Sequence, residues 1–176
     1  GRTQEEAVAA LQRGATVTST REVNEEGNPI KTSVTVALSG EPSDTRSGTP
    51  TVYLGLGEDG AIVQAGYSAA TASLGYGSLS FVDAVENDRI IEKTLQEAGI
   101  AVSENTVELP EDRSGYSTYA SDGTTLVKES CSFNGTADID GAVHEWSSVL
   151  LYDYTTANAS GNLADTIRTI YVYINA

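Results

Sequence analysis

Two aspartates carry the clearest suggestion of chemistry in this sequence. Asp138 and Asp140 are separated by one residue and are followed by Gly141, as in the middle of a calcium-binding loop. Because Ca²⁺ prefers oxygen ligands, both carboxylates are candidate ligands. A complete loop of this kind would also need acidic residues where Thr136 and Ser147 stand. The alternative interpretation is that Asp140-Gly141 is only a tight turn between two strands.

The single cysteine and the single histidine do not suggest catalysis. One Cys and one His exclude the common zinc sites within one chain, and no Gly-x-Ser-x-Gly elbow marks a serine nucleophile. Cys131 has the strand parity of Val127 and Phe133, which is typical of a small buried residue. His144 shares its parity with Trp146 and packs, on this interpretation, beside an aromatic row. We therefore expect a protein that is not an enzyme.

The glycines at 55–60 match the letters of a dinucleotide-binding fingerprint. That motif works only where a helix begins directly after it, because the helix N-terminus holds the pyrophosphate. Here the next residues, 61–63, are Ala-Ile-Val and favour a strand, and Glu58 and Asp59 stand where phosphate would bind. The segment predicts a hairpin turn, and we expect no cofactor other than Ca²⁺.

The charge balance limits the partners of the chain. Its 176 residues include 25 acidic and 10 basic side chains, a formal net charge of −15. Such a charge repels phosphate backbones and anionic lipids, so nucleic acid and membrane surfaces are not expected partners. The long uncharged stretch at 61–82 is too rich in Ser, Gly and Thr to span a membrane. The length predicts one domain over residues 1–176.

Hydrophobic periodicity predicts two helices and a series of strands. Thr3 and Glu6 form a capping box for a short N-terminal helix at 4–13, and Asp83 begins a longer helix at 83–98 that Gly99 ends. Period-two alternation predicts the strands. They are expected at 15–23, around 34–38, and at 51–56, 61–67, 102–109, 124–133, 143–155 and 166–175, with a loop at 156–164.

Short turns between consecutive strands indicate antiparallel pairing. Asp122-Gly123, Asn134-Gly135 and Asp140-Gly141 are each preferred in type I′ hairpin turns, because both central residues tolerate positive φ. The predicted fold class is mainly β: an antiparallel β-sandwich or barrel with one central helix, 83–98, packed on it and a short N-terminal helix.

Two features favour self-association. The C-terminal strand is apolar on both faces, with Tyr171 and Tyr173 on the face opposite Val172. The run at 66–78, which contains Tyr67 and Tyr76, is uncharged and small, and such strands suit pairing with another chain. We therefore predict Tyr67, Tyr76, Tyr171 and Tyr173 as contacts between copies. The alternative for the C-terminal strand is a central strand whose second face is covered by a helix. The alternative for the run at 66–78 is a mobile loop.

The function expected from these features is a non-enzymatic structural subunit of a self-assembling extracellular or virion assembly. Tail tubes, decoration proteins and β-rich pili are assemblies of this kind, and copies of the chain itself are the expected partners. The layout is similar to that of phage tail-tube subunits, although no motif supports membership of that family. The alternative is a monomeric adhesin-like or ligand-binding β-domain, in which Trp146 and nearby tyrosines form a contact platform.

Overall fold

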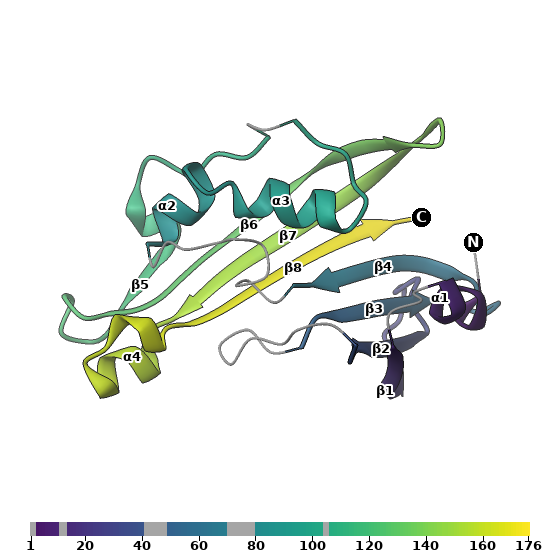
Figure 1. The fold of residues 1–176 in the computed structure, drawn as a ribbon, viewed down its shortest axis with the longest axis horizontal. Helices are drawn as coiled ribbons and strands as arrows, with labels where there is room; N and C mark the ends of the chain where they lie inside the picture. Colours follow the sequence, from purple (N-terminus) through teal and green to yellow (C-terminus); the bar gives the residue numbers. More distant parts are fainter. Residues whose placement is uncertain (1–2, 11–13, 41–48, 70–79, 104–105) are drawn as a thin grey trace.

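One antiparallel sheet of eight strands forms the centre of the computed structural model, which describes residues 3–10, 14–40, 49–69, 80–103 and 106–176 (Figure 1). The strand order is β1-β2-β3-β4-β8-β7-β6-β5. The prediction of a mainly β, antiparallel fold is therefore confirmed. The strands are β1 Ala15–Glu22, β2 Thr32–Leu38, β3 Thr51–Leu56, β4 Ile62–Ser68, β5 Ser117–Tyr119, β6 Leu126–Ile139, β7 Ala142–Asp153 and β8 Ile167–Asn175.

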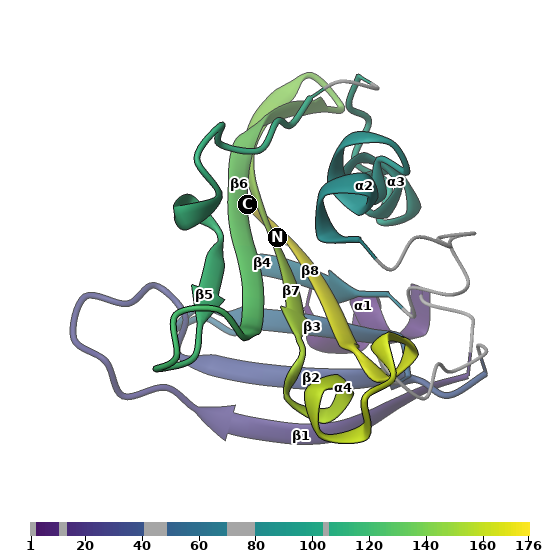
Figure 2. The ribbon, with the colours of Figure 1, turned by 90° about the vertical axis from the view of Figure 1, so that its left-hand side faces the viewer.

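The sheet consists of two meanders joined along one seam. Strands β1–β4 pair in sequence order, β5–β8 do the same, and β4 pairs with β8 between Gln64 and Ser68. Figure 2 shows β1–β4 running crosswise to β6 and β7, so the sheet twists strongly across the seam.

The strand predicted at 102–109 is wrong: the described residues of that segment form no strand. They run beside a helix instead, where Gln96 Nε2 donates to the Val102 carbonyl oxygen at 3.4 Å.

The hairpin predictions separate into right and wrong ones. Asp140 and Gly141 have φ of 53° and 83° and join β6 to β7, as predicted. The turn predicted at Asn134-Gly135 is wrong, because β6 continues through both residues and Gly135 pairs with Trp146. A Cβ at Gly135 would lie 2.6 Å from Trp146 Cζ2. The glycine therefore makes room for the indole ring and does not bend the chain.

The helix predicted at 83–98 is two helices, α2 Phe81–Glu86 and α3 Ile90–Glu97. Ser80 and not Asp83 caps α2, accepting from the Asp83 N–H at 3.3 Å. Arg89 adopts a left-handed φ of 53° between the helices. This change of direction lets both short helices bury an apolar face. The buried apolar side chains are Phe81, Ala84 and Val85 on α2 and Ile90, Ile91 and Leu95 on α3.

The remaining helices are short. The capping box of α1, Gln4–Ala10, is confirmed by reciprocal hydrogen bonds between Thr3 and Glu6 of 3.1 and 3.3 Å, while residues 11–13 lie outside the described chain. The loop predicted at 156–164 is wrong, because α4, Thr155–Ser160, occupies most of it and Gly161 ends that helix at φ 70°. None of the helices in the described ranges is long and apolar enough to cross a membrane.

The helices define two faces of the sheet. Val36, Val52, Tyr67 and Val172 form one cross-strand row on the same face, which we call the inner face. Helices α2 and α3 cover it over β6–β8 (Figure 2), and Ala7 of α1 packs against it over β2–β4. The opposite side is the outer face. Two buried clusters share the inner face: a small one of Val34, Val36, Leu54 and Leu56, and a larger one that includes Phe81, Ile91, Leu95, Trp146, Leu150, Tyr152 and Ile170.

Candidate interaction surface

Three tyrosine side chains meet on the outer face. Tyr53 of β3 lies 5.9 Å from Tyr171 and 6.3 Å from Tyr173 between ring centroids, and the two β8 rings stack at 6.3 Å with an interplanar angle of 11°. The pairing register explains the contact, because Gly66 of β4 pairs with both Tyr53 and Tyr173. We call Tyr53, Tyr171 and Tyr173 the tyrosine cluster.

Gly66 allows the tyrosine cluster to close over β4. A Cβ at this position would lie 2.5 Å from Tyr173 Cδ1, so the Tyr173 ring lies directly over the glycine backbone. The packed rings also change the acidity of the phenols. Partial burial, together with the neighbouring phenols of Tyr171 and Tyr173, raises the pKa of Tyr53 to about 12. Burial likewise raises the pKa of Tyr173.

The structure brings together only part of the predicted self-association set. Tyr171 and Tyr173 lie side by side as predicted. Tyr67 lies on the inner face, in register with Val172, and packs against the larger buried cluster. Tyr76 lies outside the described residues. The prediction missed Tyr53, whose only sequence signal is its position in the 51–56 strand on the face opposite Leu54.

The outer face around the tyrosine cluster carries no charge. None of the outer-face side chains on strands β2, β3, β4 and β8 is ionised at neutral pH, although the whole chain carries −15. These positions are Ser33, Thr35, Ala37, Thr51, Tyr53, Gly55, Gln64, Gly66, Ser68, Ile167, Thr169, Tyr171, Tyr173 and Asn175. These positions therefore contribute no charge repulsion of their own to the approach of a copy of the same chain.

Strand β1 borders this uncharged face and forms one edge of the sheet. Seven of its eight residues are exposed, and Val17 keeps 42% of its surface in contact with solvent. Within the described chain it pairs only with β2, and a bulge shifts the register between Val17 and Ser19. The other edge, β5, is only three residues long. The long edge is therefore the one with a row of backbone groups free to pair.

A second group of polar side chains surrounds Glu129 on the inner face. Glu129 is only 3% exposed. Its Oε1 accepts from the Tyr154 hydroxyl at 2.6 Å and its Oε2 from the Ser117 hydroxyl at 3.0 Å, while Arg113 Nη2 lies 3.7 Å from Oε2. Burial, and the bonded carboxylate of Glu129, raise the pKa of Tyr154. Sequence patterns could not reveal this group, because its members come from three separate segments.

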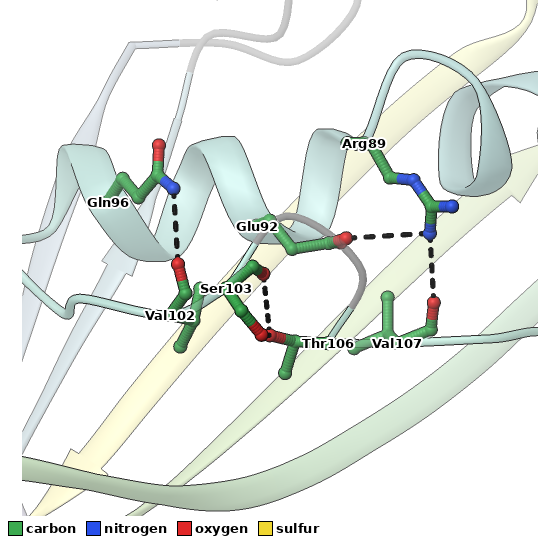
Figure 3. A network of polar contacts seen from close by, with 7 residues as sticks. All are labelled: Arg89, Glu92, Gln96, Val102, Ser103, Thr106 and Val107. Atoms are coloured by element: carbon green, nitrogen blue, oxygen red, sulfur yellow. Dashed lines mark hydrogen bonds and ion pairs between the residues drawn. The ribbon is translucent and has the colours of Figure 1, made fainter.

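Glu92 is the second buried carboxylate among the described residues. It is 2% exposed on α3, and burial raises its pKa although the backbone N–H of Glu92 itself, the Arg89 guanidinium and the Thr106 backbone act in the opposite direction. Figure 3 shows its carboxylate facing Arg89, at 3.6 Å, while Arg89 Nη1 donates to the Val107 carbonyl oxygen at 3.1 Å. Arg89 therefore joins Val107 to the start of α3.

The residues first considered for chemistry remain apart. Asp138 Oδ1 accepts from the Gly141 N–H at 2.9 Å, and no group of three or more His, Cys, Asp or Glu side chains gathers in the described ranges, so calcium binding at Asp138 and Asp140 stays a prediction. His144 Nδ1 donates to the Asn175 carbonyl oxygen at 2.9 Å. Cys131 is half-buried, and burial raises the pKa of its thiol. A contact platform at Trp146 is wrong, because that side chain is 2% exposed.

Comparison with protein-family models, with curated proteins and with solved structures finds no match for this chain.

Proposed function

We propose that this chain is a non-enzymatic structural subunit that assembles with copies of itself through β-strand contacts. The setting we propose is an extracellular or virion assembly of the tail-tube, decoration-protein or pilus kind. Strand β1 is the observation that carries the proposal, because it is a long, exposed edge without a second strand partner in the described chain. Backbone N–H and C=O groups along such an edge readily accept a strand from another chain.

The charge distribution supports contact next to β1. Copies that each carry −15 repel one another, and the uncharged outer face of β2, β3, β4 and β8 minimises that repulsion where they meet. The tyrosine cluster would supply rigid aromatic anchors, which are enriched at the centres of protein interfaces. The bulge at Thr18 would fix the register in which a second strand pairs with β1.

Light scattering during size-exclusion chromatography, with electron microscopy of the same fractions, tests the proposal. The mass should rise with salt, because the screening length falls from about 10 Å at 0.1 M to about 3 Å at 1 M ionic strength. Calcium should act in the same direction if Asp138 and Asp140 bind it, and D138N should lose the calcium effect while it keeps the salt effect. A chain that stays monomeric from low to high salt, with and without calcium, would overturn the proposal.

A pair of charge-matched variants separates pairing at β1 from general repulsion. Thr20→Glu adds one negative charge to β1, and Ser121→Glu adds one to the exposed turn beside β5, at the opposite edge. Thr20→Glu should stay monomeric in salt concentrations where the wild-type chain assembles, while Ser121→Glu should assemble like the wild type. Equal behaviour of the two variants would contradict a role for β1.

A further inference from the structure

A cavity of about 440 Å³ opens beside Glu129, at the edge of the sheet opposite β1. Its wall combines polar and apolar groups from α2, the turn at Arg113, the start of β6, α4 and the turn that follows α4. Figure 1 shows α2 and α4 at the same end of the molecule. Its volume lies within the range of about 300–1,000 Å³ that is typical of small-molecule sites. Apolar side chains of Phe81, Val82, Leu126 and Leu163 line it beside the polar ones.

The carboxylate of Glu129 can accept further hydrogen bonds within this cavity. An ionised carboxylate has about four acceptor positions on its two oxygens. Here one hydroxyl bonds each oxygen, from Tyr154 and Ser117, and Arg113 at 3.7 Å is beyond hydrogen-bond distance. Those hydroxyls hold the carboxylate in place in a position where only 3% of the residue is exposed. The site therefore offers a fixed negative group to a ligand that can donate.

Arg113 supplies the opposite charge at the mouth of the cavity. Its side chain is 60% exposed and lines the same cavity. A guanidinium has five N–H donors in a rigid plane and binds a carboxylate with two parallel bonds. Most of these donors remain available to a ligand, because the contact with Glu129 involves only Nη2.

The paired charges decide which class of ligand fits. An anion would meet the Glu129 carboxylate and a chain of −15, and a cation would meet Arg113. A molecule that carries both charges on neighbouring carbons satisfies both groups. We propose that this cavity binds a free α-amino acid with a medium-sized apolar side chain, whose ammonium donates to Glu129 and whose carboxylate accepts from Arg113. The apolar wall of Leu126, Leu163 and Val82 receives the side chain.

Titration of the wild-type chain with L-leucine tests the proposal, with calorimetry for affinity and backbone amide NMR shifts for location. Leucine should shift the amides of Thr125, Leu126 and Asn158. Two analogues each lack one charge: 4-methylpentanoate has no ammonium and 3-methylbutylamine has no carboxylate. Each should bind about tenfold more weakly or worse, because it loses the hydrogen bonds to one charged group. Absence of leucine binding up to its solubility limit, or equal binding of either analogue, would overturn the proposal.

Variants identify the two charged groups. Arg113→Gln should weaken leucine binding about tenfold, and Arg21→Gln, which makes the same charge change on β1, should not alter it. Glu129→Gln should abolish binding, with its fold checked by circular dichroism. Because the Arg113 side chain is exposed, Arg113→Gln should leave the fold intact. It therefore tests leucine binding even if the Glu129 variant does not fold. Unchanged affinity in Arg113→Gln would overturn the proposal. The outcome is independent of self-association, since β1 and this cavity lie at opposite edges of the sheet.

Discussion

The indole ring of Trp146 lies directly over the backbone of Gly135 on the neighbouring strand. The two residues are paired in the β6–β7 ladder, and a Cβ at Gly135 would approach Cζ2 of the ring to 2.6 Å and Cε2 to 2.8 Å. Both atoms belong to a rigid bicyclic side chain that is almost fully buried. The tryptophan cannot give way without disturbing the larger buried cluster around it.

Gly135→Ala should therefore destabilise the chain by about 1–3 kcal/mol through overpacking. Urea unfolding monitored by tryptophan fluorescence measures the effect. Trp146 is the only tryptophan in the sequence, so the signal comes from this one side chain. Gly115→Ala is the matched control, because its nearest neighbours, the Cβ and Cγ of Pro110, lie at 3.4 Å. The control should change stability by less than about 0.5 kcal/mol. Equal stability of the two variants would show that the indole does not constrain position 135.

The hydrogen bonds to Glu129 should contribute to stability whether or not the cavity binds a ligand. Glu129→Ala leaves the buried Tyr154 hydroxyl without its acceptor, which should cost about 1–3 kcal/mol of unfolding free energy. Glu129→Gln keeps one carbonyl oxygen as an acceptor and should cost less. Urea unfolding compares both with Glu111→Ala, an exposed control. A Glu129→Ala variant as stable as that control would contradict the assigned bonds.

Glu92 should make the folded state more stable at acid pH than at neutral pH. Burial holds its pKa above the ordinary value of about 4.3. The stabilisation from the protonated form is therefore complete below the unfolded pKa and is lost as the pH rises through the folded pKa. Glu92→Gln should raise the unfolding free energy at about pH 7 more than at about pH 4.

Urea unfolding at the two pH values measures this difference. Glu97→Gln, at an exposed position on the same helix, is the matched control and should change stability by less than about 0.5 kcal/mol at both pH values. A Glu92→Gln variant that is destabilised at neutral pH would instead indicate that the Arg89 ion pair outweighs the cost of burying the carboxylate.

The tyrosine cluster should appear in an alkaline titration. Tyr53 ionises in the folded chain at a pKa of about 12, against about 10 for an unfolded tyrosine. Its contribution to stability is thus present below about pH 10 and is lost as the pH rises through the folded value. The difference in phenolate absorbance between the wild type and Tyr53→Phe should have its midpoint near 12. A midpoint near 10 would contradict the packed cluster.

Local patterns predicted most of the strands because the inner face of the sheet is mainly apolar. The alternation in β7 places Trp146, Leu150 and Tyr152 on one buried face, and that period is readable from the sequence alone. The same local reasoning failed at Asn134-Gly135, whose turn chemistry equals that of Asp140-Gly141. Asn134-Gly135 lies within a strand because the ring of Trp146, eleven positions further along the chain, packs over Gly135. The turn propensity of the dipeptide does not indicate this contact.

Long-range register explains the other misses. Tyr53 joins Tyr171 and Tyr173 only because Gly66 pairs with both flanking strands, and one sequence does not state which strands are neighbours. The break between α2 and α3 depends in the same way on tertiary packing, which holds Arg89 at positive φ. The polar side chains of the group around Glu129 come from three segments that only the folded chain brings together.

The seam between β4 and β8 has a consequence for the order of folding. Every other strand pairing in the sheet joins consecutive strands, so each meander can form soon after its own residues leave the ribosome. The remaining side of β4 can pair only once β8, the last of these eight strands in sequence order, has been made. Until then the edge of β4 that faces β8 is unpaired, and the negative charge of the chain opposes the close approach of a neighbouring nascent chain.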